Sequence, residues 1–340
     1  MSRPRVGFLG TGWIGRHRMA AMLGTGAVEA AAICDPSPQC AAEAAGLAPA
    51  AARVDSLDEM LALELDGVAI ATPSALHAGQ SIRALQAGAA VFCQKPLGRT
   101  AAEVRAVVEA ARTADRLLGV DLSYRHTEGM RRIAELIRSG ALGRVFAIDL
   151  VFHNAYGPDK PWFYDPAQSG GGCVIDLGVH LVDLALWALG FPEVADVDAR
   201  LSASGEPLGA GEVEDHAVAR FRAGGAEVRL ACSWRLHAGR DAVIEAAFYG
   251  TEGGAALRNV GGSFYDFTAE RFAGTACERL AEPPDDWGGR AAVAWAEQLA
   301  RSPRFDREAE HFVRSAEVLD RIYGRRLPEL ARAAGAGSSG

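Results

Sequence analysis

The sequence predicts an α/β protein in which a doubly wound parallel sheet is followed by an α+β domain with a large open, mainly antiparallel sheet. Three observations favour this fold. Short apolar segments alternate with helical ones over the first third of the chain, a glycine-rich turn joins the first segment to the first helix, and near residue 122 the pattern changes to longer segments with partial alternation. Alternating strands and helices are typical of parallel sheets with right-handed crossovers, whereas apolar–polar alternation is typical of sheets with one solvated face.

We expect residues 1–122 to form the first domain. Several of its predicted strands are unbroken apolar runs, which is typical of strands that helices cover on both faces. The predicted strands are Arg5–Leu9, Val28–Cys34, Gly67–Ala71, Ala90–Cys93 and Leu117–Asp121. The helices predicted between them are Ile14–Leu23, Gln39–Gly46, Leu57–Leu63, Ala75–Ala87 and Ala101–Ala114.

We expect residues 123–330 to form the second domain and residues 331–340 to be a flexible tail, because the tail consists mostly of Ala, Gly and Ser. A polar, aromatic loop precedes the most apolar helix of this domain. The predicted helices are Glu128–Ser139, Cys173–Leu189 and Arg307–Tyr323, and the predicted strands are Arg144–Phe152, Val194–Ser202, Glu214–Arg222, Ala226–Trp234 and Ala242–Tyr249.

Charge and cysteine content argue against several classes of protein. The net charge of −8 argues against a binder of nucleic acid or anionic membranes, because both partners require a basic surface. The six cysteines are scattered without a CxxC pair, so we expect reduced thiols and neither a disulfide framework nor a metal site. The N-terminal residues lack the apolar core of a signal peptide, and no apolar run is long enough to span a membrane. We therefore expect a cytoplasmic protein.

The segment GTGWIG, residues 10–15, follows the first strand and opens the first helix. This context gives the GxGxxG pattern its meaning as a dinucleotide-binding turn, with the pyrophosphate at the helix N-terminus. Asp35 ends the second strand about 20 residues beyond Gly15, where an acid accepts hydrogen bonds from the adenosine ribose. A carboxylate there repels a 2′-phosphate, and residues 36–38 supply no arginine to bind one, which favours NAD(H) over NADP(H). The predicted coenzyme contacts here are Gly10, Gly12, Trp13, Ile14, Gly15 and Asp35. The alternative is a plain turn, with Asp35 as a helix cap.

The helix predicted over Cys173–Leu189 is apolar except for Asp176, His180 and Asp183. Their spacing of four and three residues places them on one helix face. Ionisable groups on a buried helix are costly unless they line a cavity, so this face predicts a functional site. Two alternatives stay open: an acid that complements the helix dipole beside a core histidine, and a metal site, for which the remaining ligands are lacking.

Four segments together resemble the Gfo/Idh/MocA oxidoreductases: GTGWIG, ATPSALH (71–77), CQKP (93–96) and GGGCVIDLGVHLVD (170–183). Their order and approximate spacing match over nearly the whole chain. The resemblance implies a Rossmann domain that binds NAD, an α+β domain with an open sheet, and a site between the two. It also implies a homodimer or homotetramer, assembled through the open sheet, and a substrate that is a sugar, a cyclitol or a derivative.

By position, the resemblance implies that the catalytic residues are Lys95, Asp176 and His180. It also implies that Thr72, Pro73, His77, Gln94 and Lys95 complete the coenzyme contacts. The chain departs from the family at Gln94, where Glu is usual, and at Ser74, where Asn is frequent. Because Gln94 removes a negative charge beside the ammonium, we expect Lys95 to release its proton more readily than in those relatives, and Gln94→Glu to reverse this effect.

Oxidation of a secondary alcohol requires hydride transfer to the nicotinamide and proton transfer to a base. We expect His180 to be that base, Lys95 to stabilise the alkoxide and Asp176 to position the substrate, although the roles of Lys95 and His180 could be exchanged. The loop at 152–169 is expected to cover the substrate, or else to fill the seam between the domains. The predicted substrate contacts are Arg125, His153, Asn154, Tyr156, Trp162, Asp176 and His180.

Two other functions stay open. One is a redox-neutral enzyme, in which transient oxidation by NAD enables elimination or glycoside cleavage. The other is a regulator that senses NAD without catalysis, although such a protein is expected to lose its catalytic groups.

Overall fold

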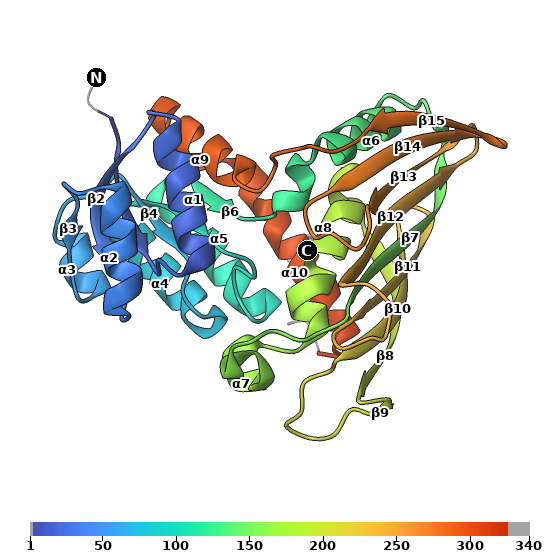
Figure 1. Ribbon diagram of the computed structural model, residues 1–340, viewed down its shortest axis with the longest axis horizontal. Helices are drawn as coiled ribbons and strands as arrows, with labels where there is room; N and C mark the ends of the chain where they lie inside the picture. The colour runs from blue at the N-terminus through green and yellow to red at the C-terminus, as the bar shows by residue number, and fades with distance from the viewer. Residues whose placement is uncertain (1–2, 326–340) are drawn as a thin grey trace, which may run out of the picture.

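The structure is a computed structural model that describes residues 3–325, so the tail predicted for residues 331–340 lies outside the described residues. Two sheets lie side by side, each with its own helices, and the last two helices run between them (Figure 1). The α/β fold class with a second, mainly antiparallel domain is confirmed.

The first sheet has six strands in the order β3-β2-β1-β4-β5-β6, and all its pairs are parallel. The strands are β1 (Arg5–Leu9), β2 (Glu29–Cys34), β3 (Ala52–Arg53), β4 (Gly67–Ile70), β5 (Ala90–Cys93) and β6 (Leu118–Val120). The helices are α1 (Trp13–Gly24), α2 (Pro38–Leu47), α3 (Leu57–Leu61), α4 (Ser74–Gln86) and α5 (Ala101–Ala114). This order reverses direction between β1 and β4, and ligands of doubly wound folds bind at such a switch point.

The second sheet has nine strands in the order β15-β14-β13-β12-β7-β11-β10-β8-β9, with one parallel pair, β7 and β11. The strands are β7 (Val145–Asn154), β8 (Val194–Ala203), β9 (Glu206–Pro207), β10 (His216–Ala223), β11 (Ala226–Ser233), β12 (Ala242–Gly250), β13 (Gly254–Asn259), β14 (Phe267–Ala273) and β15 (Ala276–Ala281). The helices that follow residue 122 are α6 (Glu128–Arg138), α7 (Pro166–Ser169), α8 (Val179–Ala188), α9 (Arg290–Arg301) and α10 (His311–Ile322).

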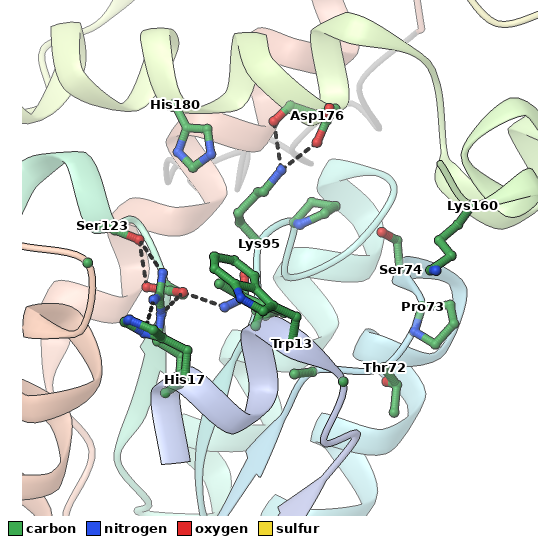
Figure 2. A pocket seen from close by; sticks show the side chains of 18 of the residues that line it. Trp13, His17, Thr72, Pro73, Ser74, Lys95, Ser123, Lys160, Asp176 and His180 are labelled. Atoms are coloured by element: carbon green, nitrogen blue, oxygen red, sulfur yellow. Dashed lines mark hydrogen bonds and ion pairs between the residues drawn. The ribbon is translucent and has the colours of Figure 1, made fainter. Parts of the chain in front are cut away.

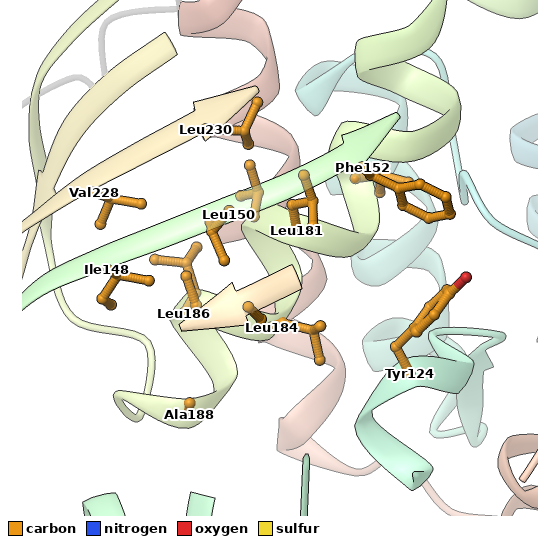
Figure 3. Packing of buried hydrophobic residues seen from close by; sticks show 14 of the residues in the cluster. Tyr124, Ile148, Leu150, Phe152, Leu181, Leu184, Leu186, Ala188, Val228 and Leu230 are labelled. Atoms are coloured by element: carbon orange, nitrogen blue, oxygen red, sulfur yellow. The ribbon is translucent and has the colours of Figure 1, made fainter. Parts of the chain in front are cut away.

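One face of the second sheet packs on helix α8. Along β10 and β11, buried and exposed residues alternate, as expected for strands with one solvated face. Figure 3 shows the inner residues Leu150 and Leu230 beside Leu181 and Leu184 of α8. The run Pro166–Ala188 is apolar enough by length and composition to cross a membrane, but 89% of its most apolar window is buried inside the protein. This run is therefore the core helix around which the second part of the chain folds.

Helix α9 lies beyond the second sheet in sequence but packs on the first sheet. Trp295 of α9 is buried against Phe92, with the ring centroids 5.8 Å apart. The strand glycines Gly67 and Gly119 make room for this indole, because a Cβ atom at either position would lie 2.8 or 2.7 Å from it. Helix α10 in turn packs between α5 and α8. The proposed division at residue 122 therefore stays a prediction, since the chain returns to its first sheet after residue 290.

Several elements were not predicted. The structure has the edge strand β3, the strands β13–β15 and helix α9, for which the sequence predicted no element. The helix predicted over Cys173–Leu189 is not uniform. It begins with a π-helical turn, Val174–Gly178, before α8.

Candidate active site

A cavity of about 1040 Å³ opens between the two domains. It is bounded by the carboxyl ends of the first sheet, the glycine turn, the start of the buried helix and the loop after β7. Of the residues predicted for the site, those that line the cavity are Gly12, Trp13, Ile14, Thr72, Pro73, His77, Gln94, Lys95, Trp162, Asp176 and His180. The predicted residues outside this lining are Gly10, Gly15, Asp35, Arg125, His153, Asn154 and Tyr156.

The glycine turn has the shape that a dinucleotide requires. Gly10 has a φ of +82°, and a Cβ atom there would lie 2.6 Å from the backbone of Ala71. A Cβ atom on Gly15 would lie 2.1 Å from the carbonyl oxygen of Gly10. Gly12, in contrast, has nothing within 4 Å of its Cβ position, and helix α1 has no side-chain cap at its N-terminus. Open space before free N–H groups is what a pyrophosphate needs, so the residues fit NAD.

Asp35 lies at the end of β2 beside this turn. Its Oδ2 accepts a hydrogen bond from the Thr11 amide at 2.6 Å, and its Oδ1 accepts one from the Ser37 amide at 2.8 Å. The Thr11 hydroxyl donates a longer bond to Oδ2 at 3.3 Å. A carboxylate has about four acceptor positions, so these bonds fix the carboxylate and leave Oδ1 able to accept from a ribose hydroxyl.

Lys95 crosses the seam between the domains. Its Nζ donates to Oδ1 of Asp176 at 2.6 Å and to the Asp176 carbonyl oxygen at 2.8 Å. The other carboxylate oxygen of Asp176 accepts from the Trp234 indole at 3.1 Å. In Figure 2, Lys95 rises from the first domain towards Asp176 and His180, which both descend from the helix of the second. The structure thus brings together the three residues predicted to be catalytic.

His180 lies in an aromatic setting, and 9% of it is exposed. The ring of Tyr124 meets its imidazole edge-on, with the centroids 4.8 Å apart. Its Nδ1 is buried without a hydrogen-bond partner among the described residues. Burial, followed by the charges of Lys95 and Arg18, holds the pKa of His180 well below its ordinary value of 6.5. His180 is therefore a neutral imidazole at neutral pH, because the charged form would leave an unpaired N–H in apolar surroundings.

The polar face of the buried helix divides into two parts. The π-helical turn rotates the residues that follow it relative to a regular α-helix, because its hydrogen bonds span one more residue. Asp176 and His180 face the cavity, whereas Asp183 is buried behind it. Oδ2 of Asp183 accepts from Nε of Arg125 at 2.5 Å, and the guanidinium of Arg125 lies over the ring of Phe191. Arg125, predicted to contact substrate, is thus occupied by a buried ion pair outside the cavity.

Gln94 belongs to a buried network beside Lys95. Its Nε2 donates to Oδ2 of Asp121, which also accepts from Nε of Arg18 at 2.6 Å. Ser123 donates to the other Asp121 oxygen at 2.8 Å, and Arg18 lies on helix α1. The Gln94 amide therefore faces Asp121, whereas Lys95 pairs with Asp176. The expected effect of residue 94 on the proton of Lys95 stays a prediction.

His77 connects the turn after β4 to the segment that holds Lys95. Its Nδ1 lies 2.7 Å from the Pro96 carbonyl oxygen, and its Nε2 lies 2.6 Å from that of Thr72. Burial lowers the pKa of His77, so the ring is neutral at neutral pH and donates to one of the two oxygens at a time. His77 thus supports the coenzyme side of the cavity.

The loop after β7 contributes part of the expected substrate wall. Trp162 lines the cavity and stacks on Phe163 with the centroids 3.8 Å apart. His153 and Asn154 belong to β7, and Nδ1 of His153 lies 2.8 Å from the Ser233 hydroxyl. Tyr156 is half exposed beside Phe264. These three residues lie outside the lining of the cavity, and their predicted contact with substrate stays untested.

Several lining residues were not predicted. They come from α1, from the end of β6 and from the loops before β14 and α9: His17, Arg18, Asp121, Tyr265, Asp285, Asp286 and Trp287. The sequence held a usable signal for two of them. Arg18 lies one turn into the helix after the glycines, and Asp121 stands at the end of a predicted strand. Residues 264–288 carried no comparable signal, because tertiary packing alone brings these loops to the seam. Among residues 3–325, no group of three His, Cys, Asp or Glu side chains is arranged to hold a metal ion.

This geometry defines a class of protein: two domains, a dinucleotide turn in the first, and a lysine, an aspartate and a histidine that meet at the seam. Residues 4–122 match the family model described as oxidoreductase family, NAD-binding Rossmann fold, and residues 130–256 match the GFO/IDH/MocA C-terminal domain. The chain belongs to the GFO/IDH/MocA family of oxidoreductases.

Several similar proteins have the names of enzymes that act on sugars or on inositol. D-glucoside 3-dehydrogenase of Escherichia coli K12 is 30% identical over 57% of this chain and 56% of that protein. Inositol 2-dehydrogenase of Rhizobium meliloti is 28% identical over 75% of this chain and 76% of that protein. The chain spans about half the length of several curated relatives, such as 56% of the first and 53% of levoglucosan dehydrogenase of Pseudarthrobacter phenanthrenivorans.

Solved structures share the fold over almost the whole chain. GenD2 from gentamicin A biosynthesis, in complex with NAD, is 25% identical with a TM-score of 0.79, covering 95% of this chain and 94% of that one. Levoglucosan dehydrogenase in complex with NADH and L-sorbose is 22% identical with a TM-score of 0.79, covering 95% and 96%.

We predict that Gly12→Ala and Gly15→Ala separate coenzyme binding from folding. Gly15→Ala forces a methyl group against the Gly10 carbonyl, so it should lower the free energy of unfolding by about 1–3 kcal/mol and also weaken NADH binding. Gly12→Ala meets no protein atom, so it should leave stability unchanged and weaken NADH binding alone. Urea unfolding and NADH fluorescence titration measure the two effects. A stable Gly12→Ala variant with wild-type affinity would contradict the placement of the pyrophosphate.

We predict that Gln94→Glu destabilises the protein at neutral pH by about 1–3 kcal/mol, because two carboxylates would then share Arg18. Their repulsion raises the pKa of one of the two carboxyl groups in the folded protein. The loss of stability should therefore grow as the pH rises above about 4 and become smaller as the pH falls towards about 4. Gln94→Glu combined with Asp121→Asn should restore stability. Urea unfolding at several pH values tests this, and a Gln94→Glu single variant as stable as the wild type would refute the contact.

Proposed function

We propose that the protein is an NAD(H)-dependent oxidoreductase that acts on a secondary alcohol or ketone of a sugar, a cyclitol or a derivative. One observation carries the proposal: Lys95, Asp176 and His180 meet in a single cavity with the glycine turn. The names of the similar proteins, which are sugar and inositol dehydrogenases, support this substrate class. The aromatic side chains of the wall, such as Trp162, Tyr265 and Trp287, suit the C–H faces of a polyhydroxylated ring.

The coenzyme would lie against the glycine turn, with Asp35 at its ribose and the segment from Thr72 to His77 along its other side. When bound, the nicotinamide accepts or returns the hydride. The residues of the chain then have to orient the substrate carbon and move a proton at the substrate oxygen. Lys95 reaches the cavity from the first domain, so its ammonium can stabilise negative charge at that oxygen. Asp176 holds the ammonium by two contacts and so fixes its position.

His180 is suited to accept the proton of the substrate hydroxyl. A base has to be neutral before it reacts, and the depressed pKa of His180 keeps it neutral over the physiological range. The same depression makes it a weak base, because its protonated form has an unpaired Nδ1. The ammonium of Lys95 can compensate by lowering the energy of the alkoxide as the proton leaves.

We predict that the rate of oxidation falls with decreasing pH only below pH 6.5, as His180 gains its proton. His180→Gln should abolish this acidic limb of kcat/KM, and Lys95→Ala should lower kcat about 10²–10⁴-fold while the fold is retained. Steady-state kinetics from pH 5 to 9 measure both effects, and circular dichroism checks the fold. Normal turnover by Lys95→Ala, or an unchanged profile for His180→Gln, would refute these roles.

The experiment that tests the proposal as a whole measures NADH formation across cyclitols, aldoses, sugar acids, glycosides and amino sugars. Net NADH from one member of the panel would support the dehydrogenase. Substrate conversion without net NADH would indicate a redox-neutral enzyme. NAD binding without conversion of any member would indicate a regulator, and either of these results would overturn the proposal.

We also propose that the outer face of the nine-stranded sheet joins copies of the chain into a homodimer or homotetramer. Val218 of β10 is 48% exposed on this face, and Arg229 of β11 pairs with Asp149 of the adjacent strand β7. Light scattering after size exclusion should give two or four subunits, and Val218→Glu should shift the mass towards the monomer. A monomeric wild type would contradict the proposal. A cytoplasmic location stays a prediction.

A further inference from the structure

We infer that Glu43 is a residue that discriminates between coenzymes: by pairing with Arg16, it keeps this guanidinium from the 2′-phosphate that distinguishes NADP(H) from NAD(H). The inference rests on the proposed function, because it requires the dinucleotide to lie along the glycine turn with its adenosine ribose at Asp35. It goes beyond that function by assigning the preference to an ion pair as well as to the acid at the end of β2.

Arg16 and Asp35 are anchored on the same residue of the glycine turn. The Thr11 amide donates to Oδ2 of Asp35 at 2.6 Å, and Nη1 of Arg16 donates to the Thr11 carbonyl oxygen at 3.3 Å. The same residue of the turn therefore holds both a guanidinium and the carboxylate expected to bind the ribose. Sequence reasoning sought such a cation only in residues 36–38, whereas helix α1 supplies it from residue 16.

Glu43 holds this guanidinium on the side of helix α2. Oε2 of Glu43 lies 2.7 Å from Nη1 of Arg16, and Oε1 of Glu43 accepts from Nε2 of Gln39 at 2.9 Å. Glu43 lies about one helical turn beyond Cys40, which lines the cavity. The pair is therefore at the edge of the cavity where α1 and α2 begin, and it is supported from within α2.

The charges around this edge oppose a 2′-phosphate. Such a group carries about −2 at neutral pH, and an arginine fork is its preferred partner. Asp35 repels it, and Glu43 both repels it and satisfies Arg16. Without Glu43, Arg16 would keep its contact with Thr11 and have donors free for the phosphate. NAD(H) has only a hydroxyl at this position, so it gains little from a free arginine.

The test measures dissociation constants of NADH and NADPH by fluorescence titration at low salt, without any substrate. Glu43→Gln keeps the size of the side chain and the partner Gln39 while removing the charge. We expect it to tighten NADPH binding about tenfold, the effect of one hydrogen bond to a charged group, and to change the NADH constant less than about twofold. Added salt should reduce the gain, because the new contact is between exposed charges.

Matched variants separate an effect through Arg16 from a general loss of negative charge. Arg16→Gln combined with Glu43→Gln should abolish the gain. Arg53→Gln combined with Glu43→Gln should keep it, since Arg53 is an exposed arginine on β3, the strand next to β2. Glu109→Gln removes a carboxylate that pairs with Arg112 on α5, and it should leave the preference unchanged.

An unchanged NADPH constant in Glu43→Gln, with NADH binding intact, would overturn the inference and leave the proposed function standing. A gain that survives Arg16→Gln, or that disappears with Arg53→Gln, would also overturn it. A wild-type protein that binds neither coenzyme would overturn the inference together with the proposed function.

Discussion

The contact between Lys95 and Asp176 is the interaction on which the site depends. It joins the end of a strand in the first domain to the buried helix of the second, and both carboxylate oxygens of Asp176 are occupied. Two partly buried charges are stable only as a pair, so either charge without its partner would destabilise the contact between the two domains. The pair therefore sets where the two domains meet and places an ammonium beside a neutral imidazole.

The other buried carboxylates around the cavity are each paired with an arginine, so their charges are balanced outside the reacting region. Asp121 is matched by Arg18, Asp183 by Arg125 and Asp285 by Arg290, each in a buried or half-buried contact. His180 and His77 are neutral because burial opposes their protonation. Of the two cations that act on His180, the ammonium of Lys95 has the larger effect, which concentrates electrostatic stabilisation on one position of a bound substrate.

Much of the first domain could be predicted from the sequence, because its signals are local. β1 and β5 were predicted with the bounds that they have, and the glycine turn indicated where a coenzyme would bind. The residues of the buried helix were found because ionisable groups are rare in apolar segments. The sequence did not predict that Asp176 and His180 face the cavity while Asp183 lies behind it, since a π-helical turn follows from packing rather than from periodicity. Gln94 was noticed as a departure, but its partner Asp121 follows another strand, β6, and only the tertiary fold brings the two together.

The packing of helix α9 has a consequence for the order in which the chain folds. The face of the first sheet that receives Trp295 is formed by strands that end by residue 120, yet its cover comes from residues 290–301. During synthesis this apolar face has to wait until nearly the whole chain has left the ribosome. The strands of the second sheet are therefore made while the first sheet still lacks part of its core.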